Sequence, residues 1–413
     1  MMDKTKKILF AIGFGIVSIA IGFGLYFLIF RPLFAPSPVV VEGPPEAGTI
    51  GALPSAGPGA ELVPTEAVQP GELAPGAAVP VTGAPTEVQP TGVVLLRDTV
   101  TQAVAPGADG KGARFYDPND GRFYRVNADG SITPLGDKAF LSVQNVEWAG
   151  RTDSAILEFP DGSNVYYDFN SKRQVTLPKH WEDFSFSPDD TQVVAKSVGL
   201  DPSNRFLIVS DPSGNEAKAV EELGRNGHLV TPMWSPNNQV IAFSQTGRAQ
   251  PEGAQEIYLI GENGENFKSL IVPGRGFQPN WSPTGQNILY SVYHERDNLK
   301  PSLWISGGAG DNIGENRRSL NLNTWADKCA WRNDSELICG VPQSLDTGAG
   351  LAPQRSAGVP DDVYSVNLKT GVSTKINTPE QIHPIRQPVL SKDKKQLIFT
   401  DAATGQLLRY DLP

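Results

Sequence analysis

One short phrase recurs along this chain: an aromatic or apolar residue, a Ser-Pro-Asp-Gly-like turn, and then an apolar strand. A faint first copy and six clearer copies begin at Val104, Trp148, Phe186, Trp234, Trp281, Trp331 and Leu390. Successive copies lie 38 to 59 residues apart. Because a repeat of this length that contains strands is typical of propellers and solenoids, the period restricts the fold more than any other feature of the sequence.

Each copy is followed by two runs rich in β-branched and aromatic residues, as half-buried strands prefer. After Trp234, for example, these runs are 241–243 and 257–260. In the turn itself, Pro presets φ at the first turn position and Gly or Asn accepts a positive φ. The large aromatic residue before the turn can fill the wedge between two neighbouring sheets. Seven such units in step therefore predict an all-β repeat fold.

The pattern Trp-Ser-Pro-(Asp/Asn/Thr)-(Gly/Asn)-x-x-(Ile/Val)-x-(Phe/Tyr) resembles the repeat of TolB-type β-propellers, over about residues 100–413. Trp234 and Trp281 fit this pattern best. The turn Pro is missing after Trp148, Trp331 and Leu390. The resemblance implies one four-stranded blade per copy, hence about seven blades, with six or eight left open. It also implies protein interaction in a cell envelope.

The last repeat lacks one strand, since residues 407–412 are followed by no further apolar run. Residues 93–96, just before the first copy, are apolar and have no other partner. We predict that this segment adds to the last blade and closes the ring, because an unpaired sheet edge is unfavourable.

The N-terminal part of the chain has the pattern of a membrane anchor. Residues 8–30 carry no charge and are long enough to cross a bilayer of about 30 Å. The cationic residues before them are Lys4, Lys6 and Lys7. This arrangement predicts a cytoplasmic tail over 1–7, a retained transmembrane helix over 8–30, and an extracytoplasmic remainder. A cleaved signal peptide is the rival interpretation, but its apolar region would be shorter.

Residues 31–91 are expected to form a disordered linker, because Pro, Gly and Glu recur there and no Lys or Arg follows Arg31. The propeller would then occupy 92–413, held above a membrane by its own helix. The chain as a whole carries a net charge of −10. A nucleic-acid partner is therefore not expected, since it would require a basic face.

Residues of three binding types occupy equivalent places, six or seven positions before a copy of the phrase. These are His180, His228, Arg275, Trp325 and His383, and Trp181 follows His180. Since such positions begin innermost strands, we expect the side chains to surround one mouth of the propeller. The longest insertions are 246–255, 293–301 and 344–361. They join second and third strands and are expected on the same face, whereas the opposite face should carry only tight turns.

This looped face is the expected binding site for a protein, a peptide or an envelope polymer. Two alternatives stay open: polar loop residues without a role, and a metal site formed by His180, His228 and His383 within about 3–4 Å of one another. The second alternative would suit a propeller-type glycan lyase or hydrolase. The sequence contains no nucleophile elbow, P-loop or His-Glu-x-x-His motif, so we expect a binding module without a cofactor.

The two cysteines, Cys329 and Cys339, lie symmetrically about Asp334, the centre of one repeated turn. Residues so placed in a hairpin face each other, with Cβ atoms about 4.5–5.5 Å apart. A disulfide is one expectation in an oxidising compartment, and two small buried apolar residues are the other.

Overall fold

The computed structural model describes residues 92–108, 110, 112–376 and 382–413. The expected cytoplasmic tail, transmembrane helix and linker, which together cover 1–91, lie outside these residues. Within the described part of the chain, no helix is long and apolar enough to cross a membrane.

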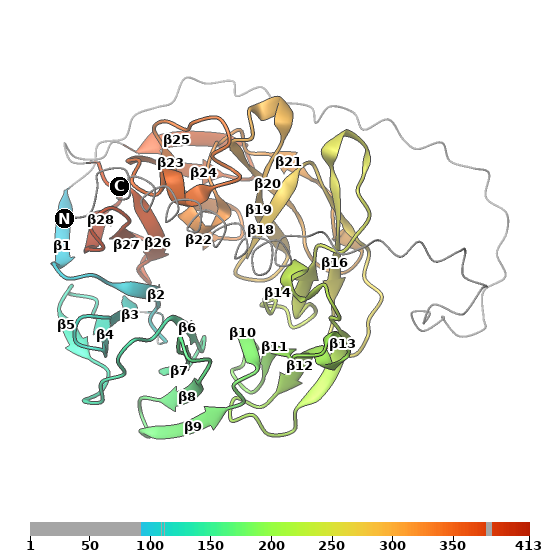
Figure 1. The fold of residues 1–413 in the computed structure, drawn as a ribbon. Helices are drawn as coiled ribbons and strands as arrows, with labels where there is room; N and C mark the ends of the chain where they lie inside the picture. Colours follow the sequence, from blue (N-terminus) through green and yellow to red (C-terminus); the bar gives the residue numbers. More distant parts are fainter. Residues whose placement is uncertain (1–91, 109, 111, 377–381) are drawn as a thin grey trace, which may run out of the picture. The chain divides into compact units, whose positions relative to one another are not determined.

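Seven four-stranded antiparallel sheets surround a common axis as the blades of a propeller (Figure 1). The first blade consists of β2 (Gln102–Pro106), β3 (Ala113–Asp117), β4 (Arg122–Val126) and β5 (Ile132–Pro134). The second consists of β6 (Asn145–Trp148), β7 (Ser154–Glu158), β8 (Asn164–Asp168) and β9 (Arg173–Leu177). The third consists of β10 (Trp181–Phe186), β11 (Val193–Val198), β12 (Arg205–Ser210) and β13 (Lys218–Glu222).

The fourth blade consists of β14 (Val230–Pro232), β15 (Ala242–Ser244), β16 (Gln255–Ile260) and β17 (Leu270–Val272). The fifth consists of β18 (Arg275–Trp281), β19 (Asn287–Tyr293), β20 (Pro301–Gly307) and β21 (Arg318–Ser319). The sixth consists of β22 (Cys329–Asn333), β23 (Glu336–Pro342), β24 (Asp361–Asn367) and β25 (Val372–Ile376). The predicted all-β fold and its seven blades are confirmed.

The seventh blade joins strands from both ends of the propeller. It contains β26 (Ile385–Leu390), β27 (Gln396–Asp401), β28 (Leu407–Asp411) and, at its outer edge, β1 (Val93–Arg97). Val93 pairs with Tyr410 and Leu95 with Leu408, so the blue β1 lies beside the red β28 (Figure 1). The predicted closure of the ring by 93–96 is confirmed.

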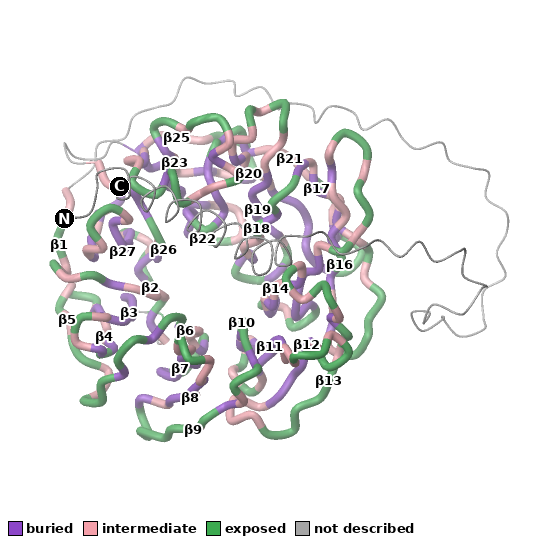
Figure 2. Tube along the Cα trace, in the orientation of Figure 1, coloured by how far each residue is buried: buried purple, intermediate pink, exposed green. Residues whose placement is uncertain are grey.

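The core lies between neighbouring blades, where the large residues of the repeated phrase are buried. Trp281, only 7% exposed, belongs to a cluster that joins the fourth and fifth blades. Its ring stacks on Phe243, with the ring centres 5.1 Å apart. Figure 2 shows the same division along the chain, with buried residues in the strands and exposed residues concentrated in their connections.

The repeated turns also bond one blade to the next. The Asp190 carboxylate accepts backbone N–H groups of Gly150, Arg151 and Thr152 at 2.7–2.9 Å, and these belong to the turn of the preceding blade. Asp334 likewise accepts the Thr284 hydroxyl at 2.7 Å. The turn residues therefore do more than reverse the chain, because they connect adjacent sheets around the ring.

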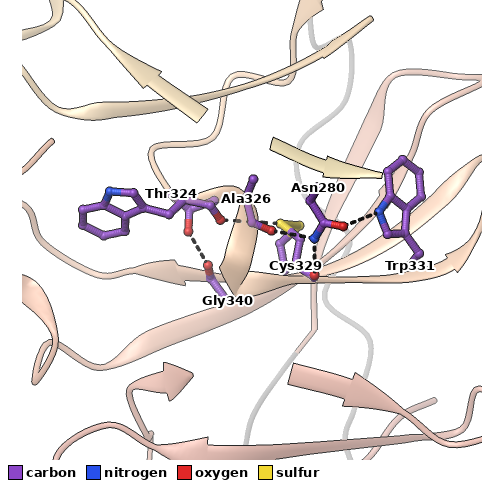
Figure 3. Close-up of a disulfide and its surroundings, with 8 residues drawn as sticks. Asn280, Thr324, Ala326, Cys329, Trp331 and Gly340 are labelled. Atoms are coloured by element: carbon purple, nitrogen blue, oxygen red, sulfur yellow. Dashed lines mark hydrogen bonds between the residues drawn. A yellow bond between two sulfur atoms is a disulfide. The ribbon is translucent and has the colours of Figure 1, made fainter. Parts of the chain in front are cut away.

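The two cysteines face each other in the first hairpin of the sixth blade, as predicted from their symmetry about the turn. The structure joins Cys329 and Cys339 in a disulfide, with Cα atoms 4.1 Å apart. Asn280 of the fifth blade connects to this hairpin (Figure 3). Its amide donates to the carbonyls of Ala326 and Cys329, and its oxygen accepts the Trp331 indole N–H at 3.2 Å.

Candidate functional site

One face of the propeller carries the connections between the second and third strands of each blade. It also carries the segments that lead from one blade into the inner strand of the next. We call it the looped face. The three longest connections between a second and a third strand are 245–254, 294–300 and 343–360. They belong to the fourth, fifth and sixth blades, which are neighbours in the ring. Their positions agree with the insertions predicted from the sequence.

These three connections are hydrogen-bonded to one another. The ring Nε2 of His294 contacts the backbone oxygen of Glu252, which links the first connection to the second. Two backbone bonds link the second to the third: Gly348 N–H to Asn298 O at 2.9 Å, and Gly350 N–H to Leu299 O at 2.8 Å. We call the three connections, 245–254, 294–300 and 343–360, the loop platform. It is one bonded unit across three blades.

Gly350 is required for the close approach of the platform's parts. A Cβ atom at this position would lie 2.5 Å from the Tyr293 Cβ and 2.8 Å from the Leu299 oxygen. Real Cβ atoms do not tolerate such distances to a backbone atom, so a larger residue would separate the second connection from the third.

Large apolar side chains are exposed on the connections of this face. Leu351 of the platform is 57% exposed. Elsewhere on the face, exposed apolar side chains occur at Val100, Leu141 and Leu200. Scattered apolar residues are ordinary on a protein surface, but an apolar residue on a bonded platform can contact a partner without losing conformational freedom.

Three of the predicted site residues are exposed on the looped face. His180 precedes β10, His228 lies in the short helix η3 (Gly227–Leu229), and Arg275 begins β18. All three are exposed, and their side chains have no hydrogen-bond or ion-pair partner among the described residues. They are free to meet a ligand.

The two predicted aromatic contact residues are buried, and the expectation that they reach solvent is wrong. Trp181 is 6% exposed and packs in the cluster between the second and third blades, with Leu177 and Phe184. Trp325 is 5% exposed and precedes the short helix η7 (Ala326–Lys328). The first residue of an inner strand can point between two sheets as well as toward the mouth, and an indole gains more free energy between the sheets.

His383 is half-buried and has a defined partner. Its Nδ1 lies 2.6 Å from Asp401, and its Nε2 is buried without a partner among the described residues. The three histidines are not assembled for a metal: within 92–108, 110, 112–376 and 382–413, no three His, Cys, Asp or Glu side chains are grouped to hold an ion.

A buried ion pair lies beneath this part of the face. Lys328 Nζ is 2.6 Å from Asp361, whose carboxylate also accepts the Ile385 N–H at 2.6 Å. Burial raises the pKa of Asp361, although Lys328 opposes the rise. The pair connects the sixth blade to the seventh and positions the backbone around His383, whose carbonyl accepts the Asp361 N–H at 3.2 Å.

The opposite face, which we call the turn face, differs from its prediction in two neighbouring blades, where 261–269 and 308–317 join the third strand to the fourth. Instead of a tight turn, residues 308–317 connect β20 to β21 and include the short helix η6 (Gly310–Asn312). This insertion lies between a strand end and a very short outer strand of two residues. The repeated phrase does not reveal this insertion, because the phrase marks only the junction of a first and a second strand.

Comparison with known proteins gives partial matches in sequence and a broad match in fold. No protein-family model matches the chain. A 95-residue segment is 30% identical to the Tol-Pal system protein TolB of Rickettsia canadensis, and covers 22% of this chain and 21% of that protein. A 65-residue segment is 37% identical to the TolB of Rickettsia felis, covering 15% of each chain. The matched segments thus span about a fifth or less of these relatives.

Solved propellers match over most of the ring at low sequence identity. An oligogalacturonate lyase in complex with manganese is 17% identical, with a TM-score of 0.52 over 79% of this chain and 95% of that one. The β-propeller domain of Swd1 from Myceliophteria thermophila is 9% identical, with a TM-score of 0.52 over 78% of this chain and 100% of that one. At these identities the likeness concerns the fold alone. Together, the structure and the partial sequence matches show a seven-bladed β-propeller whose repeats are similar to those of TolB.

Proposed function

We propose that this propeller is a binding module that docks a protein, a peptide or an envelope polymer on its looped face. The observation that carries the proposal is the loop platform, because its three connections are bonded into one unit although they come from three blades. Loops held by a rigid scaffold are the usual place for binding residues. Docking at such a site loses little conformational entropy, so more of the contact energy contributes to affinity.

The chemistry of the platform and its surroundings suits a mixed partner surface. Leu351 offers an exposed apolar contact, and Arg275 at the start of β18 and His228 in η3 offer polar groups without a partner among the described residues. Arg is a frequent contributor to binding energy at protein interfaces. The membrane helix predicted over 8–30 would hold this face outside the cytoplasm, and this localisation belongs to the same proposal.

The test compares two variants of the full chain. The first is Leu351→Ser combined with Arg275→Ala. The matched control is Tyr258→Ser, which removes an exposed aromatic side chain from β16, a strand on the side of the propeller. Each protein is immobilised and exposed to a cell-envelope extract, and the captured proteins and polymers are identified by mass spectrometry and quantified. We expect the double variant to lose at least about tenfold of one defined captured species, which equals about 1.4 kcal/mol.

Both variants should keep the melting temperature of the parent, since exposed substitutions change stability by about 0.5 kcal/mol or less. Equal capture by the parent, the double variant and the control would contradict the proposed face. A double variant that unfolds would show that the platform is structural, and smaller single substitutions at His180 and His228 would then test the rest of the face.

The enzymatic alternative, a glycan lyase or hydrolase, rests on histidines that act together. His180 and His228 have no described partner, and His383 is bonded to Asp401. We therefore place the binding module first.

A further inference from the structure

A groove lies on the turn face between the fifth and sixth blades. Its main part is a cavity of about 450 Å³, and a second part of about 210 Å³ adjoins it. Both parts are lined by Arg318, Leu368 and Lys369, so they form one elongated depression. The loop platform is on the opposite face and contributes no residue to this groove.

Beside the groove lies the insertion 308–317, which is the longest connection between a third and a fourth strand among the described residues, and its Asn316 lines the main part of the groove. The insertion folds back on the end of β20, since Gly307 N–H donates to Glu315 O at 2.9 Å and Gly314 N–H donates to Gly307 O at 3.0 Å. Lys268 of the fourth blade forms an ion pair with Glu315. These contacts hold the end of the insertion that carries Asn316 against β20 and connect it to the fourth blade.

Cations lie along the shared part of the groove. Arg318 donates one Nη2 bond to the Leu368 carbonyl at 2.5 Å, which holds the guanidinium beside the cavity with other donors left over. Lys369 is exposed, and its ammonium has no hydrogen-bond or ion-pair partner among the described residues. An Arg and a Lys at one place favour an anion, and Arg suits a carboxylate because the guanidinium can bind both oxygens.

The main part of the groove adds neutral amides and one carboxylate. The side-chain amides of Asn287 and Asn316 line it and have no hydrogen-bond partner among the described residues. Asp334 also lines it. Partial burial raises the pKa of Asp334, but hydrogen bonds from Thr284 and Ser282 outweigh that effect and hold the pKa below its usual value. Asp334 therefore stays ionised and can accept an N–H group.

We propose that this groove is a second binding site, for an acidic peptide segment in an extended conformation. A carboxylate side chain of the peptide binds Arg318 and Lys369. The backbone amides of the peptide bond with Asn287 and Asn316, and a peptide N–H reaches Asp334. The elongated shape and the mixture of amide, cationic and apolar lining match a polypeptide, which alternates backbone polar groups with side chains.

The site is independent of the proposed docking function. A partner could occupy both faces of the propeller at once, because the looped face and the turn face share no contact residue. Loss of binding at one face should therefore leave binding at the other unchanged.

The probe is a fluorescein-labelled octapeptide of alternating Glu and Gly, and a second peptide carries Gln in place of Glu. Binding to the full chain in detergent is measured by fluorescence anisotropy. We expect the Glu peptide to bind and the Gln peptide to bind at least about tenfold more weakly. Lys369→Glu should raise the Kd for the Glu peptide by about tenfold, and added salt should raise it further by screening the charges.

The matched control is Lys392→Glu, which makes the same change of charge at an exposed residue in the turn of the seventh blade, on the same face. Equal effects of the two substitutions would overturn the proposal, because they would show attraction to net charge only. Equal binding of the Glu and Gln peptides would also overturn it. If an oligogalacturonate binds in a Lys369-dependent manner and the peptide does not, the groove takes an acidic glycan and the peptide assignment is wrong.

Discussion

The four histidines of the chain occupy three kinds of environment. His180 and His228 are exposed, His383 is bonded to Asp401, and His294 contacts the Glu252 carbonyl across two loops. Alignment of the repeats singles out the first three because they occupy equivalent positions. His294 lies outside the repeat pattern. Its position within the insertion 293–301 could have identified it as a residue of the looped face. Its Nδ1 also accepts the Arg296 N–H at 3.0 Å, so both ring nitrogens serve the platform.

Glu147 on the inner strand β6 has an altered ionisation. Burial, with a smaller contribution from Glu158, raises the pKa of Glu147 to about 8. The folded protein therefore binds a proton that the unfolded chain releases near pH 4.5. Folding stability is then full below the unfolded pKa, and falls as pH rises towards about 8.

We expect Glu147→Gln to remove this pH dependence, because the amide stays neutral at every pH. Relative to the parent, the variant should gain free energy of unfolding at pH 8 and gain little at pH 5. Each unit of pKa shift corresponds to about 1.4 kcal/mol. Thermal unfolding across that pH range measures the effect. Glu216→Gln, at an exposed residue, is the control and should follow the parent. A parent whose stability does not fall between pH 5 and pH 8 would refute the assignment.

Strands and connections differ in how far the sequence determines them. The phrase at Trp234 or Trp281 locates an inner strand, a turn and a second strand, because burial between blades demands apolar residues at fixed intervals. The connections follow no such period. The insertion 308–317 and the bonds between 298–299 and 348–350 depend on which blades are neighbours in space. The prediction that Trp181 is exposed was wrong for a related reason. The side chain of the first residue in an inner strand can point to the mouth or between two sheets, and packing against the neighbouring sheet decides which.

The closing strand β1 offers a paired test within one element. Val93 packs against the core cluster of the seventh blade, whereas Leu95 is 52% exposed. Val93→Asp should lower the free energy of unfolding by about 2–4 kcal/mol, because it places a charge against apolar neighbours. Leu95→Asp in the same strand should cost about 0.5 kcal/mol or less. Urea denaturation measures both. Equal costs would mean that β1 is not docked as described.

At the scale of the whole molecule, one prediction concerns topology. We expect residues 31–413 to be outside the cytoplasm and attached to the membrane through 8–30, on the grounds of the uncharged run and the lysines before it. Protease added to intact spheroplasts should release the propeller from the membrane, and a cytoplasmic marker protein should survive. Full protection of the propeller, or a soluble mature protein that begins near Pro36, would contradict the prediction.

The pairing of β1 with β28 also sets an order of events in time. In the other six blades, every strand pairs with a strand next to it in sequence, so each blade can form as soon as its own residues have been synthesised. β1 precedes all of them and must wait for its partner until the rest of the propeller has been made. Contacts between such distant segments form late and slowly. Until then the Val-Val-Leu-Leu run of β1 stays unpaired, so a nascent or truncated chain exposes a segment that quality-control factors can recognise.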